Sequence, residues 1–338
     1  MSSTVTDNNP AFAEINALYD CLDSGDLQQT EQRCRNLQRL YPRSEMLNNL
    51  LGITLVTAGR NSEALACYQL ALKCKPGYAD AHYNIGLLLK SIGRDAEAIL
   101  SFKQAVDLDP EFADAMNNLG VLLQDQQLTD EALHYLSRAS KLAPDSAAIH
   151  FNYGNSLRAK GLLNEALTMF KRAILLNPGF AAACNNCAAV LEKMQRLEEA
   201  YDYYSRAIQL QPEYSQAFSN RGSLLKKMSK HEGALQDFRC ALEYGNWTGN
   251  LVDQNLKFRL WVNIGDILMY LLRFAEALAA YEKAHAAEPH NTDILAFKGN
   301  AIAAMGRLAE GLSLRQAAFG FIAFDSKQGI RIKHGVDQ

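Results

Sequence analysis

A fixed spacing of 34 residues constrains the fold of this chain more than any other feature. Prolines recur at that interval six times in succession, at Pro42, Pro76, Pro110, Pro144, Pro178 and Pro212. Glycines form a second series with the same spacing, at Gly52, Gly86, Gly120, Gly154, Gly222, Gly265 and Gly299. Ala188 takes one position of this glycine register, and the interval between Gly222 and Gly265 is 43 residues. Self-similarity at such a period predicts an array of repeated units instead of a single core.

Alanines and large apolar residues complete each unit. We expect an antiparallel helix pair in which the glycine faces the first alanine of the second helix, while the large residue fills the remaining gap. The proline ends the second helix. The first alanines are Ala64, Ala98, Ala132, Ala166, Ala200, Ala234 and Ala277, the large residues are Tyr68, Phe102, Leu136, Phe170, Tyr204, Phe238 and Tyr281, and a second series of alanines begins at Ala71.

This skeleton resembles the tetratricopeptide repeat (TPR) family over roughly residues 11–319. The resemblance implies an all-α fold, a right-handed superhelix or α-solenoid of about eight to nine helix-turn-helix repeats. It also implies that the first helix of each repeat lines a concave groove.

The register divides the chain into segments. We expect a disordered tail over 1–10, a degenerate capping repeat over 11–44, a regular array over 45–246, an insertion over 247–256 and further repeats over 257–319. The insertion either lengthens the next first helix or forms a loop. Gly311 and Arg315 depart from the pattern, which suggests a cap or a fraying end. Residues 320–338 read as two short strands, and a tail packed on the last helix, a disordered tail and the start of a further domain stay open.

Composition limits the classes of partner. A net charge of −3 over 338 residues gives no reason to expect a nucleic acid. No apolar run is long enough to insert in a membrane, and no secretion signal precedes residue 11. Seven cysteines, an odd number, favour reduced thiols. We therefore expect a cytoplasmic protein.

Asparagines recur two residues before the glycine register. We call this set of six the asparagine ladder: Asn84, Asn118, Asn152, Asn186, Asn220 and Asn263. A carboxamide offers a donor and an acceptor together, which complements a peptide group. The ladder resembles one in the superhelical repeat region of O-GlcNAc transferases, and that resemblance implies a peptide-binding role. Helix crossing does not require these side chains. The alternative is that they hydrogen-bond to neighbouring repeats or to water.

Other polar residues are weaker candidates. Basic side chains one turn beyond the glycine register either favour acidic peptides or are solvated helix ends; these are Lys90, Arg158, Lys193, Lys226 and Lys227. Cys184 and Cys187 form a lone CxxC, which we interpret as packing because no further ligands accompany it.

The sequence therefore predicts a scaffold that binds a protein or an extended peptide. We expect no enzyme activity, no catalytic residues, no metal and no cofactor, because no catalytic motif is present. One alternative is the substrate-recruiting part of a glycosyltransferase-like enzyme whose catalytic domain is absent from this chain. Self-association through the groove is another.

Overall fold

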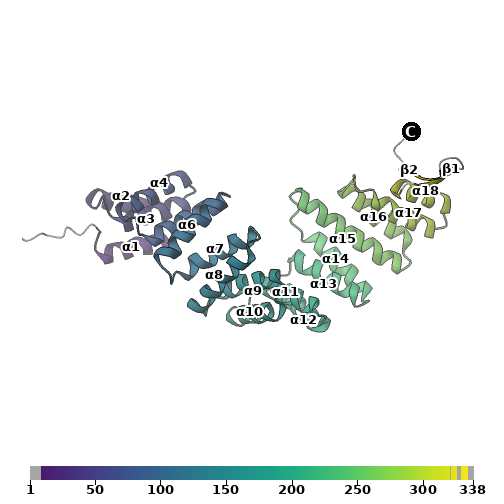
Figure 1. Cartoon of the computed structure of the whole chain (residues 1–338), viewed down its shortest axis with the longest axis horizontal. Coiled ribbons are helices and arrows are strands. Elements are labelled where there is room, and N and C mark those ends of the chain that lie inside the picture. Colours follow the sequence, from purple (N-terminus) through teal and green to yellow (C-terminus); the bar gives the residue numbers. More distant parts are fainter. Residues whose placement is uncertain (1–8, 320, 326–328, 334–338) are drawn as a thin grey trace, which may run out of the picture. The chain divides into compact units, whose positions relative to one another are not determined.

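Eighteen helices follow one another as pairs in the part of the chain that the structure describes (Figure 1). This computed structural model describes residues 9–319, 321–325 and 329–333. The chain divides into two units, Met1–Leu176 and Asn177–Gln338. Within each unit, a helix packs mainly against the other member of its pair and against a neighbouring pair. The predicted all-α array of helix pairs is therefore confirmed.

Unit 1 contains five pairs. Its first helices are α1 (Phe12–Asp23), α3 (Glu45–Thr57), α5 (Ala79–Ser91), α7 (Ala113–Asp125) and α9 (Ala147–Lys160). Its second helices are α2 (Leu27–Leu40), α4 (Asn61–Cys74), α6 (Asp95–Leu108), α8 (Thr129–Leu142) and α10 (Leu163–Leu176).

Unit 2 contains four pairs and two strands. Its first helices are α11 (Ala181–Lys193), α13 (Ser215–Lys227), α15 (Leu251–Tyr270) and α17 (Asp293–Ala304). Its second helices are α12 (Leu197–Leu210), α14 (His231–Glu243), α16 (Phe274–Ala287) and α18 (Leu308–Phe319). The strands β1 (Phe321–Asp325) and β2 (Gly329–Lys333) pair in antiparallel fashion, with Phe321 opposite Lys333. They lie where the sequence pattern indicates short strands.

The glycine in each first helix makes room for the large residue of the second helix. A Cβ on Gly86 would lie 2.6 Å from Phe102 Cε1, and a Cβ on Gly52 would lie 2.4 Å from Tyr68 Cε1. The atoms nearest to this position belong to the large side chain, which fills the gap between the two helices as expected. Both ring side chains are at most 2% exposed, so the pair closes around them.

The last pair, α17 and α18, packs differently at the glycine of its first helix. Gly311 stands where other pairs have the first alanine, and a Cβ there would lie 2.5 Å from the backbone oxygen of Gly299. The two helix backbones therefore approach each other directly. Helix α18 is continuous from Leu308 to Phe319, across both Gly311 and Arg315.

The insertion mainly lengthens a helix. Helix α15 has 20 residues, whereas α13, the preceding first helix, has 13. The non-helical residues before α15 are held by Trp247, whose indole N–H donates to the carbonyl of Leu242 at 2.8 Å. Asn250 caps the helix by accepting from the backbone N–H of Asp253. Of the two alternatives, the longer first helix is what the structure contains.

Arginines fasten one pair to the previous one. The Nη2 atoms of Arg138 and Arg206 each donate to a proline carbonyl 28 residues earlier, both at 3.1 Å. The acceptors, Pro110 and Pro178, end the preceding second helices and expose carbonyls without helical partners. Arg172 makes the same contact with Pro144 at 3.4 Å. The proline thus helps to stack the pairs as well as to end a helix.

One residue in the turn of every pair adopts the left-handed conformation. Glycine fills this position five times, and residues with a side chain fill it four times, with φ between +59° and +62°. The four are Gln127, Gln195, Ser229 and Leu272. A left-handed conformation costs a residue with a Cβ about 1–2 kcal/mol. The packing of the pairs therefore imposes the turn geometry even where the local sequence opposes it.

Replacing Leu272 by glycine is expected to raise the free energy of unfolding by about 1 kcal/mol, because the strain disappears while glycine adds some flexibility to the unfolded chain. The Leu272 side chain is 73% exposed, so little packing is lost. Hydrogen exchange of the amides in α15 and α16 measures the change. Gly93→Leu, at the equivalent turn with φ +75°, is the matched control and should lower protection of α5 and α6. Unchanged or reduced protection in Leu272→Gly would contradict the account.

Candidate functional site

The six ladder asparagines occupy the same position on successive first helices. Unit 1 carries three of them on α5, α7 and α9, and unit 2 carries three on α11, α13 and α15. All six side chains are half-buried. Within unit 1, α3 contacts α5 and α7 contacts α9; within unit 2, α11 contacts α13. Hydrogen bonds also join α5 to α7 and α13 to α15. The first helices α3 to α9 of unit 1 and α11 to α15 of unit 2 therefore adjoin one another, and we call the surface that they form in each unit the first-helix face.

Three ladder amides donate a hydrogen bond to an asparagine of the preceding pair. The Nδ2 atom of Asn84 donates to Asn49 Oδ1, that of Asn152 donates to Asn117 Oδ1, and that of Asn220 donates to Asn185 Oδ1, all at 2.9 Å. The alternative reading of the ladder, bonding between repeats, therefore holds for these three, and it holds as well for Asn118 and Asn263, which bond to other residues of the preceding pair. The bond also fixes the amide, because the Nδ2 atom points toward the preceding helix.

The acceptors of these bonds were missed in the sequence. Asn117 and Asn185 stand directly before ladder residues. Asn49 is at the equivalent position on α3, in the pair before that of Asn84. The doublets Asn117-Asn118 and Asn185-Asn186, 68 residues apart, are the signal that points to them.

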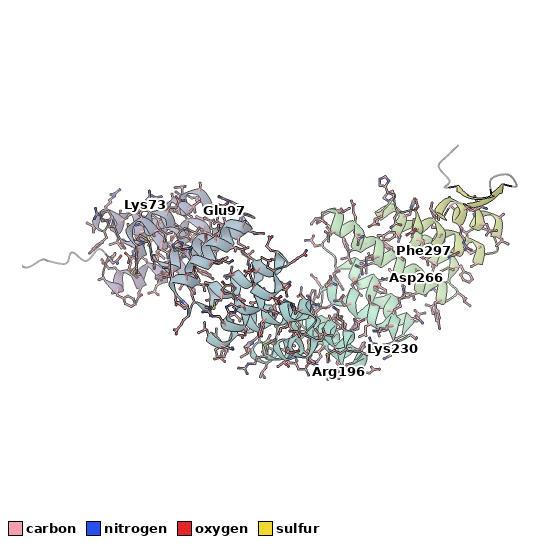
Figure 2. All side chains as sticks on the ribbon, in the orientation of Figure 1. Lys73, Glu97, Arg196, Lys230, Asp266 and Phe297 are labelled. Atoms are coloured by element: carbon pink, nitrogen blue, oxygen red, sulfur yellow. The ribbon has the colours of Figure 1, made fainter. Side chains whose placement is uncertain are left out.

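Two other ladder residues bind lysines through their amide oxygens. Lys90 Nζ donates to Asn118 Oδ1 at 3.2 Å, and Lys226 Nζ donates to Asn263 Oδ1 at 3.0 Å. Lys226 also forms an ion pair at 2.9 Å with Asp266, which Figure 2 labels. These two basic side chains are therefore partners of the ladder and not free cations for an acidic peptide.

Asn118 is the most fully bonded member of the ladder. Its Nδ2 atom donates to the Asp114 carbonyl at 3.0 Å and to Tyr83 Oη at 3.3 Å, in addition to the bond from Lys90. Asn186 accepts from Asn185 Nδ2 at 3.1 Å. The ladder residues thus share one position on their helices but differ in their hydrogen-bond partners.

Cysteine and histidine side chains serve packing. Cys184 and Cys187 are buried, and burial raises the pKa of the Cys184 thiol. His82 and His150 each direct Nε2 to the carbonyl of a proline six residues earlier. Among the described residues, no group of three or more His, Cys, Asp or Glu side chains is placed to hold a metal. None of the described helices combines the length and the apolar character needed to cross a membrane.

Comparison with family models decides the identity of the array. A model described as TPR repeat matches residues 52–93 and 88–127, and models described as tetratricopeptide repeat match residues 111–176, 181–214 and 258–291. Together these matches cover more than half of the chain. The chain belongs to the tetratricopeptide repeat family. A comparison with curated protein sequences finds no match.

Two solved structures with TM-scores above 0.5 share this fold. The pilF protein of Pseudomonas aeruginosa is 21% identical with a TM-score of 0.54, over 63% of this chain and 96% of its own. A tetratricopeptide repeat protein from Parabacteroides merdae is 20% identical with a TM-score of 0.53, over 72% and 96%. YrrB, described as a TPR protein with an unusual peptide-binding site, is 26% identical with a TM-score of 0.49, over 54% and 95%.

The Asn117–Asn152 bond of this TPR protein is expected to contribute about 1 kcal/mol to the coupling of α7 with α9. A double-mutant cycle of Asn117→Ala, Asn152→Ala and the double variant, followed by thermal denaturation, measures that coupling. Asn164 is exposed on the second helix α10. The cycle of Asn117→Ala with Asn164→Ala should be additive. Additivity in the first cycle as well would show that the bond contributes nothing.

Proposed function

We propose that this chain is a scaffold for protein interactions and that each unit binds an extended polypeptide along its first-helix face. The observation that supports this is the state of the amides of Asn84 and Asn152. Each makes one hydrogen bond, through Nδ2 to the preceding pair. The amide oxygen and the second N–H of both side chains remain for a ligand.

The chemistry of the free groups suits a polypeptide backbone. A peptide group presents one N–H and one C=O, and a carboxamide can accept from the first and donate to the second. Binding of this kind depends on the backbone of the partner and not on its side chains. The ladder would therefore hold many sequences, and neighbouring side chains would select among them.

Spacing supports the same proposal. Packed helices lie about 8–10 Å apart, and an extended chain advances about 3.3 Å per residue. One asparagine on each first helix would then meet roughly every third residue of the ligand. Asn84 and Asn152 lie two pairs apart and would meet residues about six positions apart.

The hydrogen bonds between pairs prepare the amides for binding. Asn49, Asn117 and Asn185 act as positioning residues, because they hold the Nδ2 atoms of the next ladder residues. A side chain that is already held loses less rotamer freedom when a ligand binds. Asn118 and Asn263 would contribute less, since lysines already occupy their oxygens. Asn220 would also contribute less than Asn84 and Asn152, because its oxygen accepts from Gln216 Nε2 at 2.9 Å.

Selection from a random library of 12-residue peptides tests the proposal. The full chain should select peptides, and replacing Asn84, Asn152 and Asn220 together by alanine should weaken their binding by about tenfold or more. The reason is that each lost hydrogen bond contributes about 0.5–1.5 kcal/mol, and about 1.4 kcal/mol is a factor of ten in Kd. Isothermal titration calorimetry gives the two affinities.

A matched triple variant separates binding from general effects. Asn36, Asn61 and Asn164 lie on the second helices α2, α4 and α10, and their replacement by alanine should leave the affinity unchanged. Circular dichroism checks that both variants keep their helicity. Equal affinity of the ladder variant and the original chain, or failure to select any peptide, would overturn the proposal.

A further inference from the structure

A small polar pocket opens on the first-helix face of unit 1, between α7 and α9. Its volume is about 100 Å³. Three residues of each helix line it, and one of them is the ladder residue Asn152: Val121, Gln124, Asp125, Asn152, Asn155 and Ser156. The pocket therefore lies directly where a ligand of the ladder would pass.

Two of these lining residues each carry an oxygen atom that is buried without a hydrogen-bond partner in the described structure. These atoms are Gln124 Oε1 and Ser156 Oγ, and the Ser156 side chain is only 1% exposed. The Gln124 amide is held from its other side, since Nε2 lies 3.5 Å from Thr129 Oγ1. An unpaired buried oxygen is costly. A ligand that donates hydrogen bonds here would remove that cost.

The electrostatics of the pocket favour a positive charge. Asp125 supplies a carboxylate that has no ion pair among the described residues, and none of the six lining residues is basic. Gln124 and Asp125 are also the last two residues of α7. The C-terminal end of a helix carries the negative end of its dipole and stabilises cations.

We infer that this pocket binds the ammonium group of a lysine side chain in the polypeptide held by the ladder, an inference that rests on the proposed function. An ammonium carries three N–H donors and no acceptor. Gln124 Oε1, Ser156 Oγ and the Asp125 carboxylate supply three acceptors. The pocket thus gives the groove a preference for one type of side chain, which backbone recognition alone does not provide.

Size and shape agree with a lysine end. A volume of about 100 Å³ is well above the roughly 10–15 Å³ that one water-sized group needs. An ammonium and the methylenes next to it therefore fit. Val121 provides an apolar wall for the methylenes, in keeping with the way lysine stems lie along apolar surface while the charged head meets polar groups.

Peptides selected on the full chain from the random 12-residue library test the inference. They should be enriched in lysine, and replacing that lysine by norleucine should weaken binding by about tenfold or more. A variant with Gln124→Met and Asp125→Asn keeps the side-chain lengths and removes one acceptor and the charge. With this variant the same replacement should change the affinity less than about twofold.

Two control variants distinguish a failure of the pocket inference from a failure of the proposed function. A variant with Gln104→Met and Asp107→Asn, both exposed on the second helix α6, should retain the full preference for lysine. Asn84→Ala, a ladder variant outside the pocket, should weaken the lysine and norleucine peptides by the same factor. Peptides that depend on the ladder but bind equally well with norleucine would overturn the pocket inference alone. Enrichment of hydroxyl or amide side chains instead of lysine would do so as well, and failure to select any peptide would overturn both.

Discussion

Close packing of two helices around one large side chain is the constraint on which the whole structure depends. The ring of Phe102 occupies the space where a Cβ of Gly86 would stand. A residue with a side chain in place of Gly86 would therefore force the ring to move. A pair closed in this way still has apolar surface on its outer sides. Stacking of further pairs buries that surface, and this is why the pattern must repeat.

The polar contacts between pairs follow from the same stacking. Arg138 reaches the carbonyl that Pro110 leaves free, and Asn152 reaches Asn117 on the preceding first helix. These bonds join pairs without changing the crossing of the helices inside a pair. Asn84 and Asn152 use only their Nδ2 atoms in this way, so under the proposed function the same side chain would serve both the stack and a ligand.

Much of the fold could be predicted from the sequence because its determinants are local and repeated. The glycine, alanine and proline registers located the pairs, and the widening to 43 residues marked the longer helix α15. The atoms that meet across a pair could not be predicted in the same way. The register shows that the positions of Gly86 and Phe102 recur together. Which atoms of the second helix lie nearest to the glycine depends on the angle and distance at which the two helices cross.

The positions of the candidate site residues could be predicted from the sequence, whereas their hydrogen-bond partners could not. The ladder positions follow from the register, whereas their partners depend on distances between helices that the sequence does not contain. Leu272 illustrates the limit most clearly, since its left-handed conformation opposes its local preference and results from the packing of its pair. The pocket between α7 and α9 likewise joins residues about 30 positions apart that share no motif.

The central claim is that the ladder amides held by the preceding pair contact the backbone of a bound polypeptide. Nuclear magnetic resonance of the chain labelled with ¹⁵N-asparagine reports on it directly, because each side-chain NH₂ group gives its own signals. On saturation with a selected 12-residue peptide, the signals of Asn84 and Asn152 should shift while those of Asn36, exposed on the second helix α2, stay in place. Saturation without any shift at Asn84 and Asn152 would contradict the account.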